Sequence, residues 1–362
     1  MLEQRYAHAI EFFHEQRGRL DMIGSDMATH GVSPAAELIG ITRNPVPGGA
    51  ICGTFASRDG LQIRYARWDT TAERRIGTVC LFHGRTEFIE KYFETIGDLR
   101  RRGFAVATMD WRGQGGSSRM LKNRSKGHAE NFAQFDDDVR RFMSSIVLPD
   151  CPPPYYCLAH SMGGHLVLRL AQTKVCWWDR IVLTAPMIDF AQTEKRKGLI
   201  GLGAEVLTLL GFGDSFIPGG KAQLWERAPF DGNPLTSDRL RYERAQDVLR
   251  ASPGLGIGAP TIGWVQAACA SVATLASTAF MESIRVPTLI VAASNDQIVS
   301  NTAMERFASH VKNCRLIVVS GARHEILMER DQLRDQFWAA FDAYVPGSTL
   351  LPRRLEQPEI AL

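Results

Sequence analysis

The stretch Ala159-His160-Ser161-Met162-Gly163-Gly164-His165 (AHSMGGH) follows a short apolar run, PYYCL, that is typical of a buried strand. Behind the glycines the chain continues as LVLRLAQ, which is typical of a helix. A serine in this place can belong to an ordinary turn, because Ser and Gly are common there. It can also be a nucleophile on a tight strand-to-helix corner, where small residues two positions before and after it let the chain reverse. The rest of the sequence decides between these interpretations.

Strand-like and helix-like segments alternate on both sides of Ser161. Strand-like runs are TVCLFHG, FAVATMDWRG, PYYCLAHS, RIVLTAP, VPTLIVAASND and CRLIVVSG. Helix-like runs between or after them include FIEKYFETIGDLRRRG, NFAQFDDDVRRFMSSIV, NTAMERFASHV and LRDQFWAAFDAYV. TFASRDGLQIRYARW, which comes first, predicts a β-hairpin. The alternation predicts an α/β fold with a mostly parallel central sheet and helices on both faces.

The alternation stops near Met187, and the following residues mix helical segments with loops rich in Gly and Pro. We therefore expect one α/β domain interrupted by an insertion. In an N-terminal arm, Tyr6, Ile10 and Phe13 have the spacing of a short helix. The expected divisions are an arm over 1–50, a first core part over 51–189, a helical insertion over 190–282, a second core part over 283–346 and a tail over 347–362.

Composition excludes several classes of protein. The 362 residues are 45% hydrophobic and 22% charged, as in ordinary globular proteins. A net charge of +3 without a long basic stripe argues against a nucleic-acid partner. Seven scattered cysteines, with no CxxC pair, argue against a disulfide framework or a zinc site. We expect no metal and no organic cofactor.

Two apolar stretches could suggest a membrane protein. LIGLGAEVLTLLGFG (199–213) is too short to span a bilayer, and the uncharged stretch 251–281 opens with Gly and Pro and carries polar residues. The first residues, MLEQRYAHAIEFFHEQRGRL, lack the apolar region of a secretory signal. We expect a cytoplasmic protein that can dock transiently at the inner face of the membrane. The sequence does not indicate an oligomeric state.

A serine nucleophile needs a base, and the base needs an acid that orients it. On the strand-to-helix corner the chain order should be serine, acid, histidine, each just past a strand. Asp296 follows the strand PTLIVAASN and His324 follows the strand RLIVVSGAR. We therefore predict a catalytic triad of Ser161, Asp296 and His324.

Acyl transfer also needs hydrogen-bond donors for the oxyanion. One is the backbone N–H after the nucleophile, on Met162. The loop His83-Gly84-Arg85, after the strand TVCLF, supplies the second through the N–H of Arg85. We expect His83 to fix this loop and His160 to be packed on the side of the strand opposite Ser161.

The motifs LFHGRTEFIEKY, MDWRGQGGSS, KGHAENFAQFDDDV, LAHSMGGH, LTAP, SND and RHEIL occur in this order. Together with NPLTSDRLRY and PTIGWV in the insertion, they make the chain similar, over about residues 50–345, to α/β-hydrolases. It most resembles the bacterial lysophospholipases and monoacylglycerol lipases, also described as serine aminopeptidase S33-like hydrolases. The resemblance implies that Ser161, Asp296, His324, Arg85 and Met162 have the roles given above, and that the insertion caps an acyl pocket.

Such a protein would hydrolyse a fatty-acyl ester of a lipid-like substrate through an acyl-enzyme. Arg85 and Lys195-Arg196-Lys197 could meet a phosphate, which favours a lysophospholipid over a monoacylglycerol. Alternatively, Arg85 pairs with Glu87 and the basic run is solvated. Two other functions stay open: a small-ester or peptide hydrolase with the same triad, and a binding protein that keeps the fold without turnover.

Overall fold

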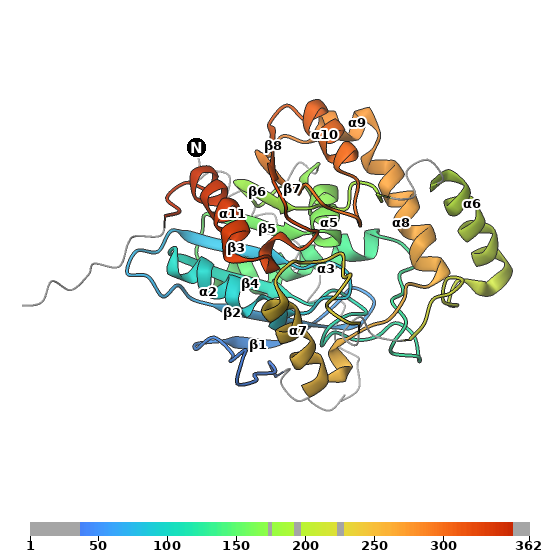
Figure 1. The fold of residues 1–362 in the computed structure, drawn as a ribbon, viewed down its shortest axis with the longest axis horizontal. Coiled ribbons are helices and arrows are strands. Elements are labelled where there is room, and N and C mark those ends of the chain that lie inside the picture. The colour runs from blue at the N-terminus through green and yellow to red at the C-terminus, as the bar shows by residue number, and fades with distance from the viewer. Residues whose placement is uncertain (1–36, 173–175, 192–196, 223–227, 350–362) are drawn as a thin grey trace, which may run out of the picture.

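The computed structural model describes residues 37–172, 176–191, 197–222 and 228–349 (Figure 1). Its centre is an eight-stranded sheet with the strand order β1-β2-β4-β3-β5-β6-β7-β8. The strands are β1 (Ile51–Ala56), β2 (Gln62–Trp68), β3 (Gly77–Phe82), β4 (Phe104–Met109), β5 (Tyr155–His160), β6 (Arg180–Thr184), β7 (Thr288–Ala293) and β8 (Cys314–Val319). The β1–β2 and β2–β4 pairs are antiparallel, and all other neighbouring strands are parallel. The predicted α/β fold class is confirmed.

The inner strands read as continuous apolar runs because helices cover both faces of the sheet. Strands β3, β4, β5 and β7 are buried along their whole length. On β3, Cys80 and Phe82 join one apolar cluster, whereas Val79 and Leu81 join the cluster on the opposite face. The first face is covered by α3 (Ala133–Phe142), α5 (Met162–Ala171) and α10 (Asn301–His310), and the second by α2 (Phe93–Arg101) and α11 (Asp331–Tyr344).

The predicted hairpin is formed by β1 and β2, whose register runs from Ile51 opposite Arg67 to Ala56 opposite Gln62. Its turn is closed by the Ser57 N–H, which donates to the carbonyl of Leu61 at 2.8 Å. Gly60 lies in this turn with φ of 85°, a conformation that residues with a Cβ rarely adopt. The hairpin adds the antiparallel edge to an otherwise parallel sheet.

The described residues between β6 and β7 form helices, turns and loops but no further strand of the sheet. These are α6 (Lys197–Leu207), the π-helical turn η3 (Thr208–Phe212), α7 (Arg239–Ala251), the 3₁₀ turn η5 (Pro253–Leu255), α8 (Ile262–Leu275) and α9 (Thr278–Ser283). Helix α6 lies beside α8 at one end of the molecule (Figure 1). The insertion boundaries 190 and 282 stay a prediction.

Some sequence expectations fall on residues outside the described part of the chain. These are the short helix at Tyr6, Ile10 and Phe13, the tail beyond residue 349, and Lys195 and Arg196 of the basic run. Within the described part, no helix is both long enough and apolar enough to cross a bilayer. All seven cysteines carry free thiols, and four of them, Cys80, Cys151, Cys157 and Cys314, are buried.

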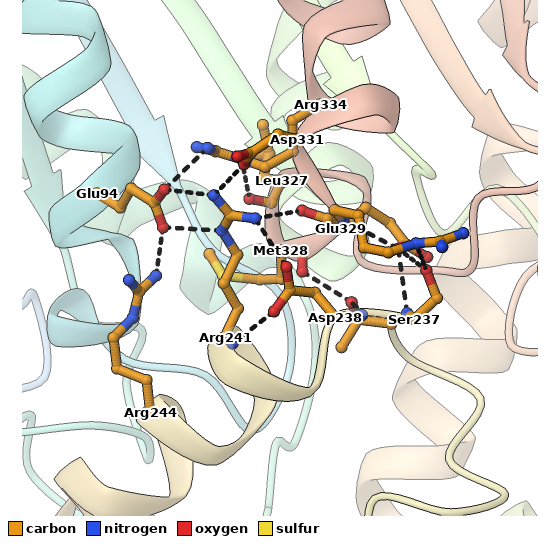
Figure 2. A network of polar contacts seen from close by, with 12 residues as sticks. Glu94, Ser237, Asp238, Arg241, Arg244, Leu327, Met328, Glu329, Asp331 and Arg334 are labelled. Carbon is orange, nitrogen blue, oxygen red and sulfur yellow. Dashed lines mark hydrogen bonds and ion pairs between the residues drawn. The ribbon is translucent and has the colours of Figure 1, made fainter. Parts of the chain in front are cut away.

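Helix α7 of the insertion is tied to the core by ion pairs (Figure 2). The Arg241 guanidinium donates to both carboxylate oxygens of Glu94 on α2, at 2.9 and 2.6 Å, and to the Glu329 carbonyl at 2.9 Å. Arg334 on α11 reaches the same Glu94 carboxylate at 3.0 Å. Burial raises the pKa of Glu94, but hydrogen bonds from Arg241 and the charge of Arg334 outweigh it and lower the pKa to about 2. Helix α7 is thus docked on α2 and α11.

Candidate active site

Ser161 lies on the corner between β5 and α5 and has φ of 51° and ψ of −117°. This strained conformation is typical of a nucleophile held above the edge of a sheet. A Cβ on Gly163 would come within 2.5 Å of the His83 carbonyl oxygen, and one on Gly164 within 2.9 Å of the Pro186 Cβ. The glycine pair therefore lets α5 begin directly against the neighbouring loops.

The predicted triad residues lie in one hydrogen-bonded chain. The His324 Nε2 is 3.0 Å from the Ser161 Oγ, and its Nδ1 is 2.8 Å from the Asp296 Oδ2. The other carboxylate oxygen of Asp296 accepts the N–H groups of Ile298 and Val299 at 2.8 and 3.0 Å. Burial opposes ionisation, but the hydrogen bond and charge of His324 keep the pKa of Asp296 below its usual value. An ionised Asp296 fixes the tautomer in which Nε2 can accept a proton from serine.

Two backbone N–H groups of the loop after β3 already have acceptors. The Gly84 N–H donates to the Glu87 carboxylate, and the Thr86 N–H donates to the Gln114 Oε1 at 2.7 Å. Within the described part of the chain, the N–H groups of Arg85 and Met162 donate to no backbone or side-chain oxygen. The two predicted donors are thus the ones left available beside Ser161.

Three further histidines surround the corner and are all held by hydrogen bonds. The His83 ring lies 2.8 Å from the Gly84 carbonyl oxygen and 3.2 Å from the Asp110 carboxylate, so it fixes the loop as expected. The His160 Nδ1 is 3.0 Å from the Thr184 carbonyl oxygen, and burial lowers the pKa of His160 to about 4. His165 bridges the Met187 carbonyl and the Ser271 hydroxyl at 2.8 and 2.7 Å.

A cavity of about 220 Å³ opens directly at Ser161. Its polar lining includes Ser161, His324 and the loop residues Gly84 to Glu87. Its apolar lining consists of Met162, Met187, Phe190, Leu235, Trp264, Ile298 and Val299, contributed by both the core and the insertion. A second cavity, of about 560 Å³ between α7 and residues 228–231, shares no lining residue with the first and has no serine or histidine in its wall. The predicted triad therefore opens onto the smaller cavity.

A buried ionic group next to the triad was not anticipated from the sequence. Lys91 Nζ lies 2.7 Å from a carboxylate oxygen of Glu87 and 2.6 Å from one of Glu325, the residue after His324. Burial opposes ionisation of both carboxyls, but the charge of Lys91 lowers the pKa of Glu87, while that of Glu325 stays raised. Glu87 and Lys91 are four residues apart, a spacing at which opposite charges can pair on a helical turn, so the sequence contained a signal for this ion pair. No local pattern pointed to Glu325.

The expected alternative of an Arg85–Glu87 pair is wrong, because Glu87 is occupied elsewhere. Its carboxylate accepts hydrogen bonds from the Gly84 N–H and from the Tyr92 hydroxyl, the latter at 2.8 Å, and forms an ion pair with the Lys91 ammonium. Arg85 instead donates through Nη2 to the Gly258 carbonyl at 2.9 Å. Its guanidinium lies 5.0 Å from the centre of the Trp264 ring.

The strand order, the serine corner and the Ser161–His324–Asp296 chain define an α/β-hydrolase with a serine at the nucleophile position. Residues 73–331 match the family model described as serine aminopeptidase, S33. The chain belongs to this hydrolase family.

Relatives and solved structures agree with this placement. The chain is 33% identical to lysophospholipase L2 of Escherichia coli (strain K12) over 291 residues, which cover 77% of this chain and 83% of that protein. It is 28% identical to the probable lysophospholipase L2 of Haemophilus influenzae over 255 residues, 70% of this chain and 79% of that one. A soluble variant of monoglyceride lipase from Saccharomyces cerevisiae shares the fold, with a TM-score of 0.64 and 18% identity over 84% of this chain and 97% of the other. The chain is thus a hydrolase whose relatives are named for lipid ester cleavage.

Proposed function

We propose that this hydrolase cleaves the fatty-acyl ester of a monoacyl lipid, a lysophospholipid or a monoacylglycerol, through an acyl-enzyme on Ser161. The observation that carries the proposal is the chain of hydrogen bonds from Ser161 through His324 to Asp296, at the mouth of a largely apolar cavity. The names of the relatives, lysophospholipase L2 in two bacteria, favour the lysophospholipid.

In the proposed mechanism the Ser161 Oγ attacks the ester carbonyl carbon while His324 Nε2 takes the hydroxyl proton. The N–H groups of Arg85 and Met162 donate to the oxyanion of the tetrahedral intermediate. The bond to the alcohol breaks, and His324 returns the proton to the leaving oxygen. His324 then deprotonates a water molecule, which attacks the acyl-enzyme. The bond from the acyl carbon to Ser161 Oγ breaks, His324 returns the proton to Oγ, and the fatty acid leaves. Asp296 holds the Nδ1–H and stabilises the imidazolium that forms.

Apolar side chains from the insertion support a fatty-acyl substrate. Trp264 and Leu235 belong to the insertion and line the cavity that opens at Ser161. Each methylene that an acyl chain buries there contributes about 0.8 kcal/mol. We therefore infer that residues 190–282 form a cap over the acyl site.

The outer surface of this cap supports transient contact with a membrane. Large apolar side chains are exposed on α6 and η3, among them Leu199 at 75%, Leu202 at 58%, Leu209 at 82%, Leu210 at 66% and Phe212 at 51%. Exposed apolar groups this dense on one short segment are unusual for a free surface and suit the boundary of a lipid layer. In this proposal α6 and η3 meet the lipid layer that holds the substrate.

The first test is release of palmitate from palmitoyl-lysophosphatidylglycerol and from monopalmitoylglycerol. We expect the wild-type protein to release palmitate and Ser161→Ala to reduce the rate by at least about a thousandfold, as loss of a nucleophile does in serine hydrolases. Labelling of Ser161 by a fluorophosphonate, absent in Ser161→Ala, reports an activated serine independently of the substrate.

The same experiment separates the other two functions. Labelling without palmitate release would favour a small-ester or peptide hydrolase, which p-nitrophenyl acetate and aminoacyl anilides would then identify. Neither labelling nor release from folded protein would favour a binding protein without turnover. The hydrogen-bonded Ser161, His324 and Asp296 speak against this last function.

A further inference from the structure

Arg85 is a largely buried cation whose side chain is poorly supplied with hydrogen-bond acceptors. Its one side-chain hydrogen bond among the described residues runs from Nη2 to the Gly258 carbonyl at 2.9 Å. Its Nε is buried and has no acceptor. Both Arg85 and Trp264, over whose ring the guanidinium lies, line the cavity at Ser161. Arg85 is therefore a residue of the cavity wall whose guanidinium makes one hydrogen bond and has an Nε–H without an acceptor.

No carboxylate of the described residues compensates the charge of Arg85. Glu87, two residues away, is bound to Lys91 at 2.7 Å. Burial, with no neighbouring anion to oppose it, lowers the pKa of the Arg85 guanidinium to about 10, so that it is still charged at neutral pH. Taking a cation out of water without a partner is costly, and such a group is normally paired or neutralised.

Arg119 is a second partly buried arginine and is compensated differently. It also lacks a carboxylate partner, and burial lowers its pKa to about 10. Yet its guanidinium donates to the carbonyls of Gly115, Ser117 and Gly254, at 2.9, 2.9 and 2.7 Å. Backbone oxygens thus compensate Arg119 from several sides, whereas the Arg85 guanidinium has a single carbonyl and the Trp264 ring.

We propose that the Arg85 side chain binds the phosphate of a lysophospholipid headgroup, an assignment that rests on the proposed function. A guanidinium offers several N–H donors in a planar fork that matches the oxygens of a phosphate, and the attraction is strengthened where water is excluded. The backbone N–H of the same residue faces the ester oxygen in the proposed mechanism. In the lipid, the glycerol unit separates the ester from the phosphate. In Arg85, the side chain separates the backbone N–H from the guanidinium, so that one residue can contact both groups. Arg85 would thereby favour a lysophospholipid over a monoacylglycerol with the same acyl chain.

The test compares palmitoyl-lysophosphatidylglycerol with monopalmitoylglycerol, both below their critical micelle concentrations. The variant Arg85→Met keeps the backbone N–H and most of the side-chain volume but loses the charge. We expect the ratio of kcat/KM for the lysophospholipid to kcat/KM for the monoacylglycerol to fall about 10- to 100-fold. Arg85→Lys, which keeps the charge but not the fork, should lose less. Arg119→Met controls for removal of a buried arginine and should leave the ratio of the two substrates unchanged.

Binding is measured separately from turnover, in a Ser161→Ala background. Titration with palmitoyl-lysophosphatidylglycerol should give a dissociation constant about 10- to 100-fold higher when Arg85→Met is added. Thermal unfolding of Arg85→Met checks that the variant is folded. Removal of a charge without a partner should leave its midpoint equal to or above that of the wild type.

Four results would overturn the assignment. An equal loss on both substrates would give Arg85 a structural role, and no loss on either would give it no role in recognition. Arg85→Met could instead leave the substrate ratio unchanged and weaken inhibition by added palmitate to the same extent with both substrates. This result would identify the carboxylate of the fatty-acid product as the partner of Arg85. If the wild-type protein releases palmitate from neither substrate, the proposed function itself fails and this assignment fails with it.

Discussion

Glu329 accepts a hydrogen bond from the backbone N–H of Arg323, the residue before His324, at 2.9 Å. The other oxygen of the same carboxylate accepts the N–H and the hydroxyl of Ser237, in the insertion (Figure 2). Glu329 is fully buried, so these bonds are made without competition from water. One carboxylate thus connects the segment before α7 to the loop that carries the proposed general base.

Substitution Glu329→Gln should lower kcat about tenfold and change KM less than twofold. The amide of glutamine has one acceptor oxygen, and its NH₂ group cannot accept a hydrogen bond. One of the donors, the Arg323 N–H or the Ser237 group, therefore loses its acceptor, and the loop around His324 loses its alignment. The free energy of unfolding should fall by about 1–3 kcal/mol. Steady-state kinetics and urea unfolding measure these quantities, with the exposed Glu305→Gln as control. A variant that loses stability but keeps the wild-type kcat would show that Glu329 does not position His324.

Substitution Lys91→Met should destabilise the protein by about 3 kcal/mol, because Glu87 and Glu325 then lie buried without a cation. Activity should also fall, since Glu87 holds the Gly84 N–H beside the proposed oxyanion donor. The double variant Lys91→Met/Glu325→Gln removes one uncompensated carboxyl and should recover part of the lost stability. Chemical denaturation of the three proteins measures this. Equal stability of Lys91→Met and the wild type would contradict a balanced ionic group.

Stability should decline below neutral pH because of buried histidines. Burial lowers the pKa of His165 to about 3, whereas in an unfolded chain it is about 6.5. Between these values the unfolded state binds a proton that the folded state does not. The stability that His165 contributes is therefore present above pH 6.5 and is lost as the pH falls toward 3, by about 1.4 kcal/mol per pH unit.

Measurement of unfolding free energy against pH tests this contribution. His165→Gln should show a shallower decline than the wild type between about pH 6 and pH 4. His310→Gln, which removes a histidine from an exposed surface, is the matched control. Parallel curves for His165→Gln and the wild type would exclude a titrating His165 as the cause.

The double substitution Leu209→Ser/Leu210→Ser should weaken binding to phosphatidylethanolamine–phosphatidylglycerol vesicles severalfold. The two side chains are 82% and 66% exposed, so the change costs little packing in the protein but removes apolar area for the lipid layer. Hydrolysis of p-nitrophenyl butyrate in solution should be unchanged. Leu240→Ser, at an equally exposed leucine of α7, serves as the control. Vesicle cosedimentation in which both variants bind as the wild type would argue against docking through α6 and η3.

Much of the fold was predictable because its signals are local. Continuous apolar runs such as TVCLF became strands buried on both faces, and helix-like runs between them became α2, α3 and α10. The positions of Ser161, Asp296 and His324, each just past a strand, predicted that they meet, since carboxyl ends of parallel strands share one edge. In the structure the three side chains do meet and are joined by hydrogen bonds. Their catalytic roles stay a prediction until the assays are made.

The partners of charged side chains could not be predicted in the same way. Glu87 stands two residues from Arg85 in the sequence but binds Lys91, and Lys91 also binds Glu325, 234 residues away. The ion-pair partner of a long side chain is set by which elements pack beside it. Separation along the sequence is a weak guide to this packing. Glu329 gave no signal either, because its partners come from the turn before α7 and from its own loop.

The sequence by itself determined the strand–helix order, the tight serine corner and the order of the proposed triad, because hydrophobic period and turn chemistry act over a few residues. Only the tertiary structure decided that Arg85 is left without a carboxylate while Lys91 has two, and that the insertion holds the His324 loop through Glu329. The physical reason is that burial and pairing of a charge depend on all the elements that pack around it.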